Sequence, residues 1–432
     1  MRFDNLEAWL EWQAGLSPRA VDLGLERVRQ VWHALGTPSL DAPVITVAGT
    51  NGKGSSVAFA EAILQQAGYC TGCYTSPHLQ RYNERVRVDA AAVDDSTLCH
   101  AFDRIDRARG DTALTYFEFG TLAALVIFAD AAVDAIVLEV GLGGRLDAVN
   151  LVDCDVALIT QIGLDHQDWL GDDVEVIGRE KAGVMRAGRP AVFSGSSMPS
   201  SIAAHAARIG AGLLVAGRDY RAERHGDAWN LLSAGTNRRA LPYPLMRGSM
   251  QVDNAAGVVV ALDCLRERLP LDAGAINAGL LAARLRGRFD VRPGRPTWIF
   301  DVAHNPQAAG RLDEMLADED SPGQRIAVFG ALEDKDVAGI GGALAQRFDR
   351  WCLVDLSSQP RGLPASVLRQ HLAGTVDGDK LQVCGDVAST LGGLQVAADD
   401  QVVVFGSFLT VGAAMDWMDA QDTAFAEPRQ GI

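Results

Sequence analysis

One segment of the chain has the residue types and order of a phosphate-binding loop. An apolar run at 44–48 leads into a glycine-rich turn before a segment with helical spacing, and the turn reads Gly49-Thr50-Asn51-Gly52-Lys53-Gly54-Ser55. The glycines let backbone N–H groups close around an anion, the helix N-terminus adds partial positive charge, and Lys53 adds a full charge. The hydroxyl of Ser55 or Ser56 is placed to reach Mg²⁺. This order predicts a polyphosphate site rather than a solvated turn, although the loop is shorter than the common P-loop.

Three polar side chains lie at the ends of other predicted strands. They are Ser76, Glu139 and His166. Because the carboxyl ends of parallel strands converge on one crevice, we expect these side chains to lie close together. Glu139 ends an apolar strand, so its carboxylate needs a positive partner, which is either a metal ion or an arginine such as Arg145. Lys181 follows on a predicted helix, where a lysine taken alone is expected to be solvated.

The elements that must carry these residues alternate between strand and helix. Two amphipathic helices are expected within residues 5–35, and later strands, helices and one hairpin are expected at 70–75, 96–108, 118–131, 135–140, 156–160, 190–216 and 219–233. Asn254 lies at the start of a predicted helix over 253–268. A polar loop containing Arg81 and Tyr82 follows the strand at 70–75, where it contacts either a ligand or only solvent. The alternation predicts an α/β fold with a mainly parallel sheet.

A second α/β unit is predicted after a basic, turn-rich stretch at 286–289. We therefore expect two domains, 1–287 and 288–432. Strands of the second unit are expected at 297–300, 326–330, 352–355 and 402–405. The first of them ends beside Asp301 and His304, which are candidates for a ligand-facing edge.

Composition limits the classes of partner. The 432 residues are 48% hydrophobic and 22% charged, with a net charge of −16, which argues against a nucleic-acid backbone or an anionic membrane. No apolar stretch is long enough to span a bilayer and no signal-type segment opens the chain, so the cytoplasm is the expected location. The C-x-x-C pair Cys70 and Cys73 has no second pair near it, which favours buried thiols over a zinc or redox site.

Six motifs in one order resemble the Mur-ligase superfamily, and within it the folylpolyglutamate synthase/dihydrofolate synthase family. They are Gly49-Thr50-Asn51-Gly52-Lys53-Gly54-Ser55, Thr75-Ser76-Pro77-His78-Leu79, Leu138-Glu139-Val140-Gly141-Leu142-Gly143-Gly144-Arg145-Leu146-Asp147, Leu164-Asp165-His166, Arg179-Glu180-Lys181-Ala182-Gly183 and Asp301-Val302-Ala303-His304-Asn305-Pro306. The resemblance implies a P-loop domain with a mainly parallel sheet, of the Mur-ligase central type, followed by a smaller Rossmann-like C-terminal domain.

The resemblance also implies roles for single residues. Lys53, Lys181 and His304 would be catalytic, with Lys181 carried as an N-carboxylated lysine. ATP would contact the P-loop, Asn254, Arg288 and Asp301. Mg²⁺ would be bound by Ser76, Glu139 and His166. The acceptor would lie against Ala20, Val21, Asp22, Leu23, Arg81, Tyr82, Thr115, Tyr116, Phe117, Glu118, Leu146, Asp147 and Ala148.

The activity implied by the resemblance is ATP-driven amide formation through an acyl phosphate. L-glutamate would be added to dihydropteroate or to a folate, with ATP and two Mg²⁺ ions, and K⁺ is a further candidate cofactor. A monomer that binds neither nucleic acid nor membrane is expected. The sequence leaves open whether both synthase activities are present and which folate chain length is preferred.

Two other functions are weighed against this one. A Mur enzyme that extends a UDP-linked cell-wall peptide usually carries an extra N-terminal domain, and a P-loop at residue 49 leaves little room for one. A P-loop NTPase switch would have an apolar strand ending in an aspartate. Here the predicted strand at 135–140 carries Glu139 near its end and is followed by Gly-Leu-Gly-Gly at 141–144.

Overall fold

The larger sheet of the molecule has eight strands. The computed structural model describes residues 1–17, 19, 21–165, 167–233 and 236–426, so that Ala20 and His166 lie outside the described residues. The strands run in the order β4-β3-β2-β5-β1-β6-β7-β8. Their bounds are β1 (Val44–Ala48), β2 (Thr71–Tyr74), β3 (Val86–Val88), β4 (Ala91–Ala92), β5 (Ala135–Glu139), β6 (Val156–Ile159), β7 (Pro190–Phe193) and β8 (Gly212–Val215). Six strands are parallel, and β3 and β4 add an antiparallel edge.

Helices cover both faces of this sheet, as apolar parallel strands require. Successive side chains of β1 point to opposite faces: Val44 and Ala48 belong to one core, and Ile45 and Val47 to the other. The first core contains α1 (Leu6–Leu16), α2 (Glu26–Ala34), α4 (Asp95–Arg109), α5 (Tyr116–Asp130), α7 (Val174–Ala182) and α8 (Ser200–Ile209). The second contains α3 (Lys53–Gln66), α9 (Met250–Asp263), α10 (Ala273–Ala282) and a small sheet of β9 (Tyr220–His225), β10 (Ala228–Ser233) and β11 (Arg238–Pro242).

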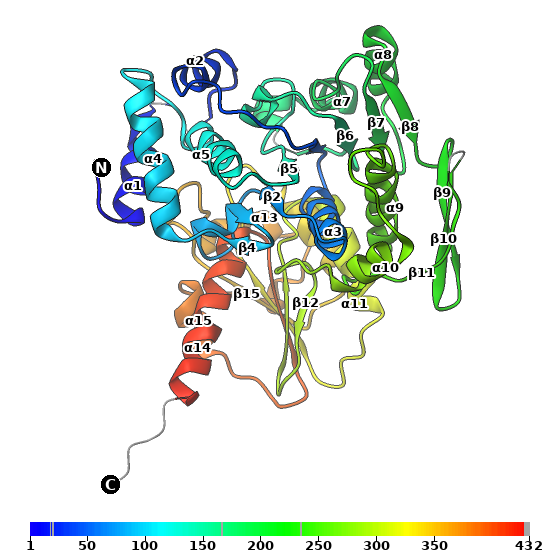
Figure 1. The fold of residues 1–432 in the computed structure, drawn as a ribbon. Helices are drawn as coiled ribbons and strands as arrows, with labels where there is room; N and C mark the ends of the chain where they lie inside the picture. Colours follow the sequence, from blue (N-terminus) through cyan, green and yellow to red (C-terminus); the bar gives the residue numbers. More distant parts are fainter. Residues whose placement is uncertain (18, 20, 166, 234–235, 427–432) are drawn as a thin grey trace.

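The second α/β unit has a six-stranded sheet in the order β12-β13-β17-β14-β15-β16. Figure 1 shows this unit, coloured yellow to red, beneath the first. Its strands are β12 (Asp290–Arg292), β13 (Thr297–Asp301), β14 (Arg325–Phe329), β15 (Arg350–Leu353), β16 (Leu381–Val383) and β17 (Gln401–Phe405). One face packs against α11 (Pro306–Ala317), α12 (Val337–Leu344) and α13 (Ala365–Leu372), and the other against α14 (Val387–Gly393) and α15 (Phe408–Ala426).

The α/β class and the mainly parallel sheet agree with the sequence prediction. One helix differs at its ends, because α9 begins at Met250 and ends at Asp263 rather than covering 253–268. Short strands such as β12 and β16 were not predicted, since three residues carry too little periodicity. Within the described part of the chain, every helix is too short or too polar to cross a bilayer.

Candidate active site

The predicted phosphate loop connects β1 to α3, whose first residue is Lys53. Gly52 has a φ of +94°, and a Cβ added there would lie 2.6 Å from Oδ1 of Asn254. The loop is held on its other side, where Thr160 Oγ1 donates a hydrogen bond of 2.8 Å to the carbonyl of Asn51. Ser56 Oγ donates to the carbonyl of Gly52, which leaves Ser55 as the hydroxyl candidate. The loop is therefore preorganised, and glycine at 52 is required both by φ and by the contact with Asn254.

Lys53 supplies a half-buried cation inside this loop. Its Nζ donates to the carbonyls of Gly49 and Thr50, each at 3.2 Å. Burial lowers the pKa of Lys53, and the carboxylate of Glu139 acts in the opposite direction. The loop therefore combines backbone amides with one charge that a phosphate group could neutralise.

Glu139 ends β5 as a buried carboxylate with few hydrogen-bond partners in the described part of the chain. Its Oε2 accepts one long hydrogen bond, 3.3 Å, from the backbone N–H of Ser76. Burial raises the pKa of Glu139, and the charge of Lys53 opposes the increase. Arg145 is not its partner, because Arg145 forms a 3.0 Å ion pair with Glu180.

The donors at this position fit Mg²⁺. No group of three His, Cys, Asp or Glu side chains is close enough to hold a metal within the described ranges. Mg²⁺ does not need such a cage, since it is usually bound by one or two carboxylates together with substrate phosphates and water. Glu139 and the hydroxyl of Ser76, beside the P-loop, form such a set of hard oxygen donors.

Lys181 is buried rather than solvated. It lies on α7, is 5% exposed, and its Nζ donates a 2.8 Å hydrogen bond to the carbonyl of Gly49. Burial, with the nearby charge of Lys53, lowers the pKa of Lys181 to about 7, although Asp165 and Asp147 act in the opposite direction. An amine with this pKa is substantially uncharged near neutral pH. The expectation from the residue alone was therefore wrong.

The second unit contributes side chains that face the P-loop. Arg288 is half-buried, and its desolvation lowers its pKa, while Asp301 and Glu139 act to raise it. Both carboxylate oxygens of Asp301 accept backbone N–H groups at 2.8 Å, so this residue fixes the chain around Arg288. His304 Nδ1 donates to the carbonyl of Val302 at 2.8 Å, and its Nε2 lies 3.3 Å from Oδ2 of Asp165.

Sequence reasoning did not single out two residues that join the units. Lys335 Nζ donates to Oδ1 of Asp165 at 2.7 Å, and both side chains are at least nine-tenths buried. Asn51 of the P-loop donates to Oε1 of Gln307 at 2.6 Å. Asp165 belongs to the predicted motif at 164–166, which follows a strand end. Lys335 and Gln307 give no such local signal.

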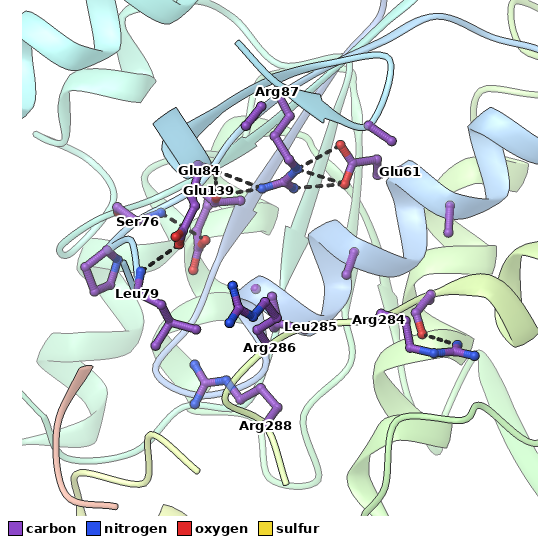
Figure 2. A pocket seen from close by; sticks show the side chains of 18 of the residues that line it. Glu61, Ser76, Leu79, Glu84, Arg87, Glu139, Arg284, Leu285, Arg286 and Arg288 are labelled. Carbon is purple, nitrogen blue, oxygen red and sulfur yellow. Dashed lines mark hydrogen bonds and ion pairs between the residues drawn. The ribbon is translucent and has the colours of Figure 1, made fainter. Parts of the chain in front are cut away.

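A cavity of about 410 Å³ lies where these groups meet. It is bordered by the P-loop, by Ser76, His78, Arg85, Glu139, Asp165 and Lys181 of the first unit, and by Arg288, His304, Lys335, Arg361 and Ser407 of the second. A neighbouring cavity of about 460 Å³ shares Ser76, Glu139 and Arg288 with it. Figure 2 shows this neighbouring cavity, with Arg286 and Arg288 opposite Ser76 and Glu139. The volumes are in the range of small-molecule sites.

The three segments predicted to bind the acceptor are linked to one another. Asp22, between Val21 and Leu23, accepts from Arg27, and Arg27 also pairs with Glu118 at 3.0 Å. The backbone N–H of Gly24 donates to the carbonyl of Leu146 at 3.2 Å. The segments at 21–23, 115–118 and 146–148 therefore lie side by side.

The side chains of these segments are mostly engaged within the protein. Thr115 and Glu118 form the capping box of α5. Phe117 lies against Gly141, where an added Cβ would come within 2.7 Å of its ring. Asp147 accepts the N–H groups of Leu142 and Val149, and burial raises its pKa to about 6. Ala148 begins the short helix η2 (Ala148–Leu151).

Arg81 and Tyr82 are not placed together. Both belong to the turn around η1 (Tyr82–Arg85), but Arg81 is exposed and lines a separate hollow with Gln80 and Arg286. Tyr82 is buried against the rings of Tyr116 and Phe102. The structure therefore separates this predicted pair into one surface residue and one packing residue.

Comparison with known proteins gives consistent matches. Residues 287–408 match the model of the Mur ligase, glutamate ligase domain. The chain is 43% identical over 416 residues to the dihydrofolate synthase/folylpolyglutamate synthase of Escherichia coli K12, covering 96% of each chain.

Solved structures give the same result. E. coli FolC in complex with DHPP and ADP matches with a TM-score of 0.90 and 42% identity, over 97% of this chain and 99% of that one. A bifunctional folylpolyglutamate synthase/dihydrofolate synthase with Mn, AMPPNP and L-glutamate bound matches with a TM-score of 0.87 and 43% identity, over 96% and 98% of the two chains.

Proposed function

The chain belongs to the dihydrofolate synthase/folylpolyglutamate synthase family of Mur-type ligases, and on that premise we propose a role for each residue of the site. It is an ATP-dependent ligase that adds L-glutamate to dihydropteroate, forming dihydrofolate, and to folate and tetrahydrofolate polyglutamates. The observation that carries these roles is the single cavity in which the P-loop, Glu139, Lys181 and the cations of the second unit meet. A cell-wall ligase and an NTPase switch are accordingly set aside.

The reaction brings negative groups together, and the cations of the cavity offset their repulsion. The acceptor carboxylate attacks the γ-phosphorus of ATP, giving an acyl phosphate and ADP, and the amine of L-glutamate then displaces phosphate. We assign the triphosphate to the P-loop amides, Lys53 and Ser55, with Arg288 and His304 reaching it from the second unit. When bound, Mg²⁺ at Ser76 and Glu139 supplies further charge neutralisation, and His166 is assigned to the same site.

The adenosine is assigned to a cavity of about 480 Å³ beside α9. Asn254, which touches the P-loop at Gly52, donates to Oε1 of Gln251 at 3.2 Å, and Gln251 lines this cavity. Phe289 of the second unit lines it as well, and its backbone N–H is held by Asp301. We therefore propose that Asn254 and Asp301 support ATP binding by positioning Gln251 and Phe289, which line the adenosine cavity.

We assign the incoming L-glutamate to the second unit. Lys335 and Arg361 line the cavity from that side. We propose 287/288 as the boundary between the units, a position supported by the start of the six-stranded sheet at β12 and by the start of the glutamate ligase match at 287. Closing the two units over ATP would exclude water that otherwise hydrolyses the acyl phosphate.

The defining assay uses purified protein, Mg-ATP and radiolabelled L-glutamate, with dihydropteroate and tetrahydrofolate offered separately. We expect glutamate to enter both acceptors and phosphate release to require acceptor and glutamate together. Phosphate release from ATP alone at the same rate would contradict the ligase mechanism and favour an NTPase.

Lys181→Ala is expected to lower kcat by about 100-fold and to respond to added acetate. With a pKa of about 7, the Lys181 amine is available in its neutral form, and only that form attacks CO₂ to give a carbamate with release of a proton. A short carboxylate diffusing into the space left by the side chain would replace the carbamate in part. The measurement is kcat for glutamate ligation with and without acetate.

Two comparisons make the acetate test specific. Acetate is expected to leave the wild-type rate unchanged and to give no recovery in Lys53→Ala, whose missing charge is positive. A Lys181→Ala variant with full activity would contradict the carboxylated lysine.

The proposed location is the cytoplasm and the proposed state is a monomer. All seven cysteines are free, as is usual in a reducing compartment.

A further inference from the structure

Arg85 is a buried cation in the wall of the main cavity, and the roles assigned above do not use it. It is the last residue of η1, is 9% exposed, and lines the cavity together with Lys53 and Ser76. Its Nε donates a 2.8 Å hydrogen bond to Nδ1 of His78. A buried guanidinium needs a negative partner, so the partners around it decide what it does.

The carboxylate next to it in sequence is engaged elsewhere. Glu84 accepts three successive backbone N–H groups, at 2.7 to 3.0 Å, from Leu79, Gln80 and Arg81. Figure 2 shows Glu84 directed at the amide of Leu79. Glu84 therefore fixes the loop and does not neutralise Arg85.

The next arginine along the chain, Arg87, has a carboxylate partner. Arg87 forms a 2.9 Å ion pair with Glu61, which Figure 2 shows with both carboxylate oxygens facing the guanidinium. Arg85, by contrast, has no carboxylate within ion-pair distance among the residues that the structure describes. The chain thus neutralises Arg87 of β3 and leaves Arg85, at the end of η1, without a carboxylate partner among the described residues beside the cavity.

His78 does not supply the missing charge, and the surrounding rings hold the cation in place. Nδ1 of His78 accepts the hydrogen bond from Nε of Arg85 and therefore carries no proton, and an imidazole in this state has no negative charge to offer. The guanidinium carbon lies 5.3 Å from the ring centroid of Tyr82 and 5.5 Å from that of Tyr116. A planar cation fixed between rings is suited to bind a carboxylate through two hydrogen bonds.

We propose that Arg85 binds the non-reacting carboxylate of a glutamate-bearing acceptor, and thereby serves the polyglutamate reaction rather than the dihydrofolate reaction. The proposal rests on the proposed function. Dihydropteroate ends in one carboxylate, which is the one that reacts. A folate ends in a glutamate whose second carboxylate does not react and requires a cation.

The position of Arg85 favours the acceptor over the incoming amino acid. Its neighbours Tyr82 and Tyr116 belong to the first unit, and Tyr116 begins α5 in one of the predicted acceptor segments. The cations assigned to the incoming glutamate, Lys335 and Arg361, belong to the second unit. Lys53 and Arg288 are already assigned to the phosphates.

The test compares kcat/KM for the two acceptors in Arg85→Met and Arg85→Lys at saturating Mg-ATP. Because truncating one partner of a buried charge pair removes a large part of binding, we expect about a 100-fold fall with tetrahydrofolate in Arg85→Met and a change of no more than about 3-fold with dihydropteroate. Arg85→Lys keeps the charge but loses the planar fork, so an intermediate fall is expected. Arg104→Gln, which removes an exposed arginine paired with Asp130, is the matched control and should behave as wild type.

Several outcomes would overturn the assignment. Equal loss with both acceptors would make Arg85 a structural or general catalytic residue, and an equal rise in the KM for L-glutamate in both reactions would place it at the amino-acid site. Turnover of dihydropteroate reports that the variants fold, and if Arg85→Met does not fold, Arg85→Lys gives the same comparison. Wild-type protein inactive with both acceptors would instead refute the proposed function.

Discussion

Lys53→Ala is expected to lower kcat for glutamate ligation by roughly 10³-fold or more, because it removes the full positive charge at the centre of the P-loop. The backbone amides would remain, but they carry only partial charges. Lys53 Nζ makes two hydrogen bonds of 3.2 Å to loop carbonyls, so its loss should change the free energy of unfolding by only about 1 kcal/mol. The effect should therefore appear in catalysis and not in folding.

The measurement for Lys53→Ala combines steady-state ligation with thermal unfolding. Lys380→Ala is a useful control, since Lys380 lies just before β16, the edge strand of the six-stranded sheet, and donates to the carbonyl of Phe348. Near-normal turnover of Lys53→Ala would refute the role given to the P-loop cation. A protein that no longer unfolds cooperatively would show that Lys53 is needed for the fold instead.

The residues that local patterns located correctly lie at strand ends. Glu139 is the last residue of β5 and Asp301 the last of β13, and both are buried at the carboxyl edge of a parallel sheet. An apolar β-branched run specifies such a strand over a few residues, and parallel topology brings the ends to one side. This part of the site follows from the order of the chain.

The contacts that local patterns missed join residues far apart in sequence. Lys335 reaches Asp165 across 170 positions, and Asn51 reaches Gln307 across 256. Lys181 was expected to be solvated because a helix lysine taken alone usually is, yet its position on α7 faces the P-loop. Which face of a helix is buried, and which loop lies opposite, depends on tertiary packing that periodicity does not contain. The resemblance supplied the role of Lys181, and Lys335 remained without a signal.

Glu139→Gln is expected to lower kcat by roughly 10³-fold while leaving the protein at least as stable as wild type. Glutamine keeps the shape of the side chain but removes the charge that would bind Mg²⁺ beside the triphosphate. Stability should not fall, because the carboxylate is buried and the hydrogen bond it accepts within the described residues, from the N–H of Ser76, is 3.3 Å long and can be accepted by an amide oxygen. Activity and thermal unfolding are measured over a series of Mg²⁺ concentrations.

The Mg²⁺ series separates a metal ligand from a merely buried acid. If Glu139 binds the ion, higher Mg²⁺ should restore part of the activity in Glu139→Gln, since the hydroxyl of Ser76 and the phosphates still offer ligands. Glu223→Gln on the exposed hairpin strand β9 should keep wild-type activity at every concentration. Wild-type activity of Glu139→Gln would contradict the metal role. A large fall in its stability would show instead that the carboxylate of Glu139 serves to neutralise the charge of Lys53 or Arg288, which the substitution leaves unpaired.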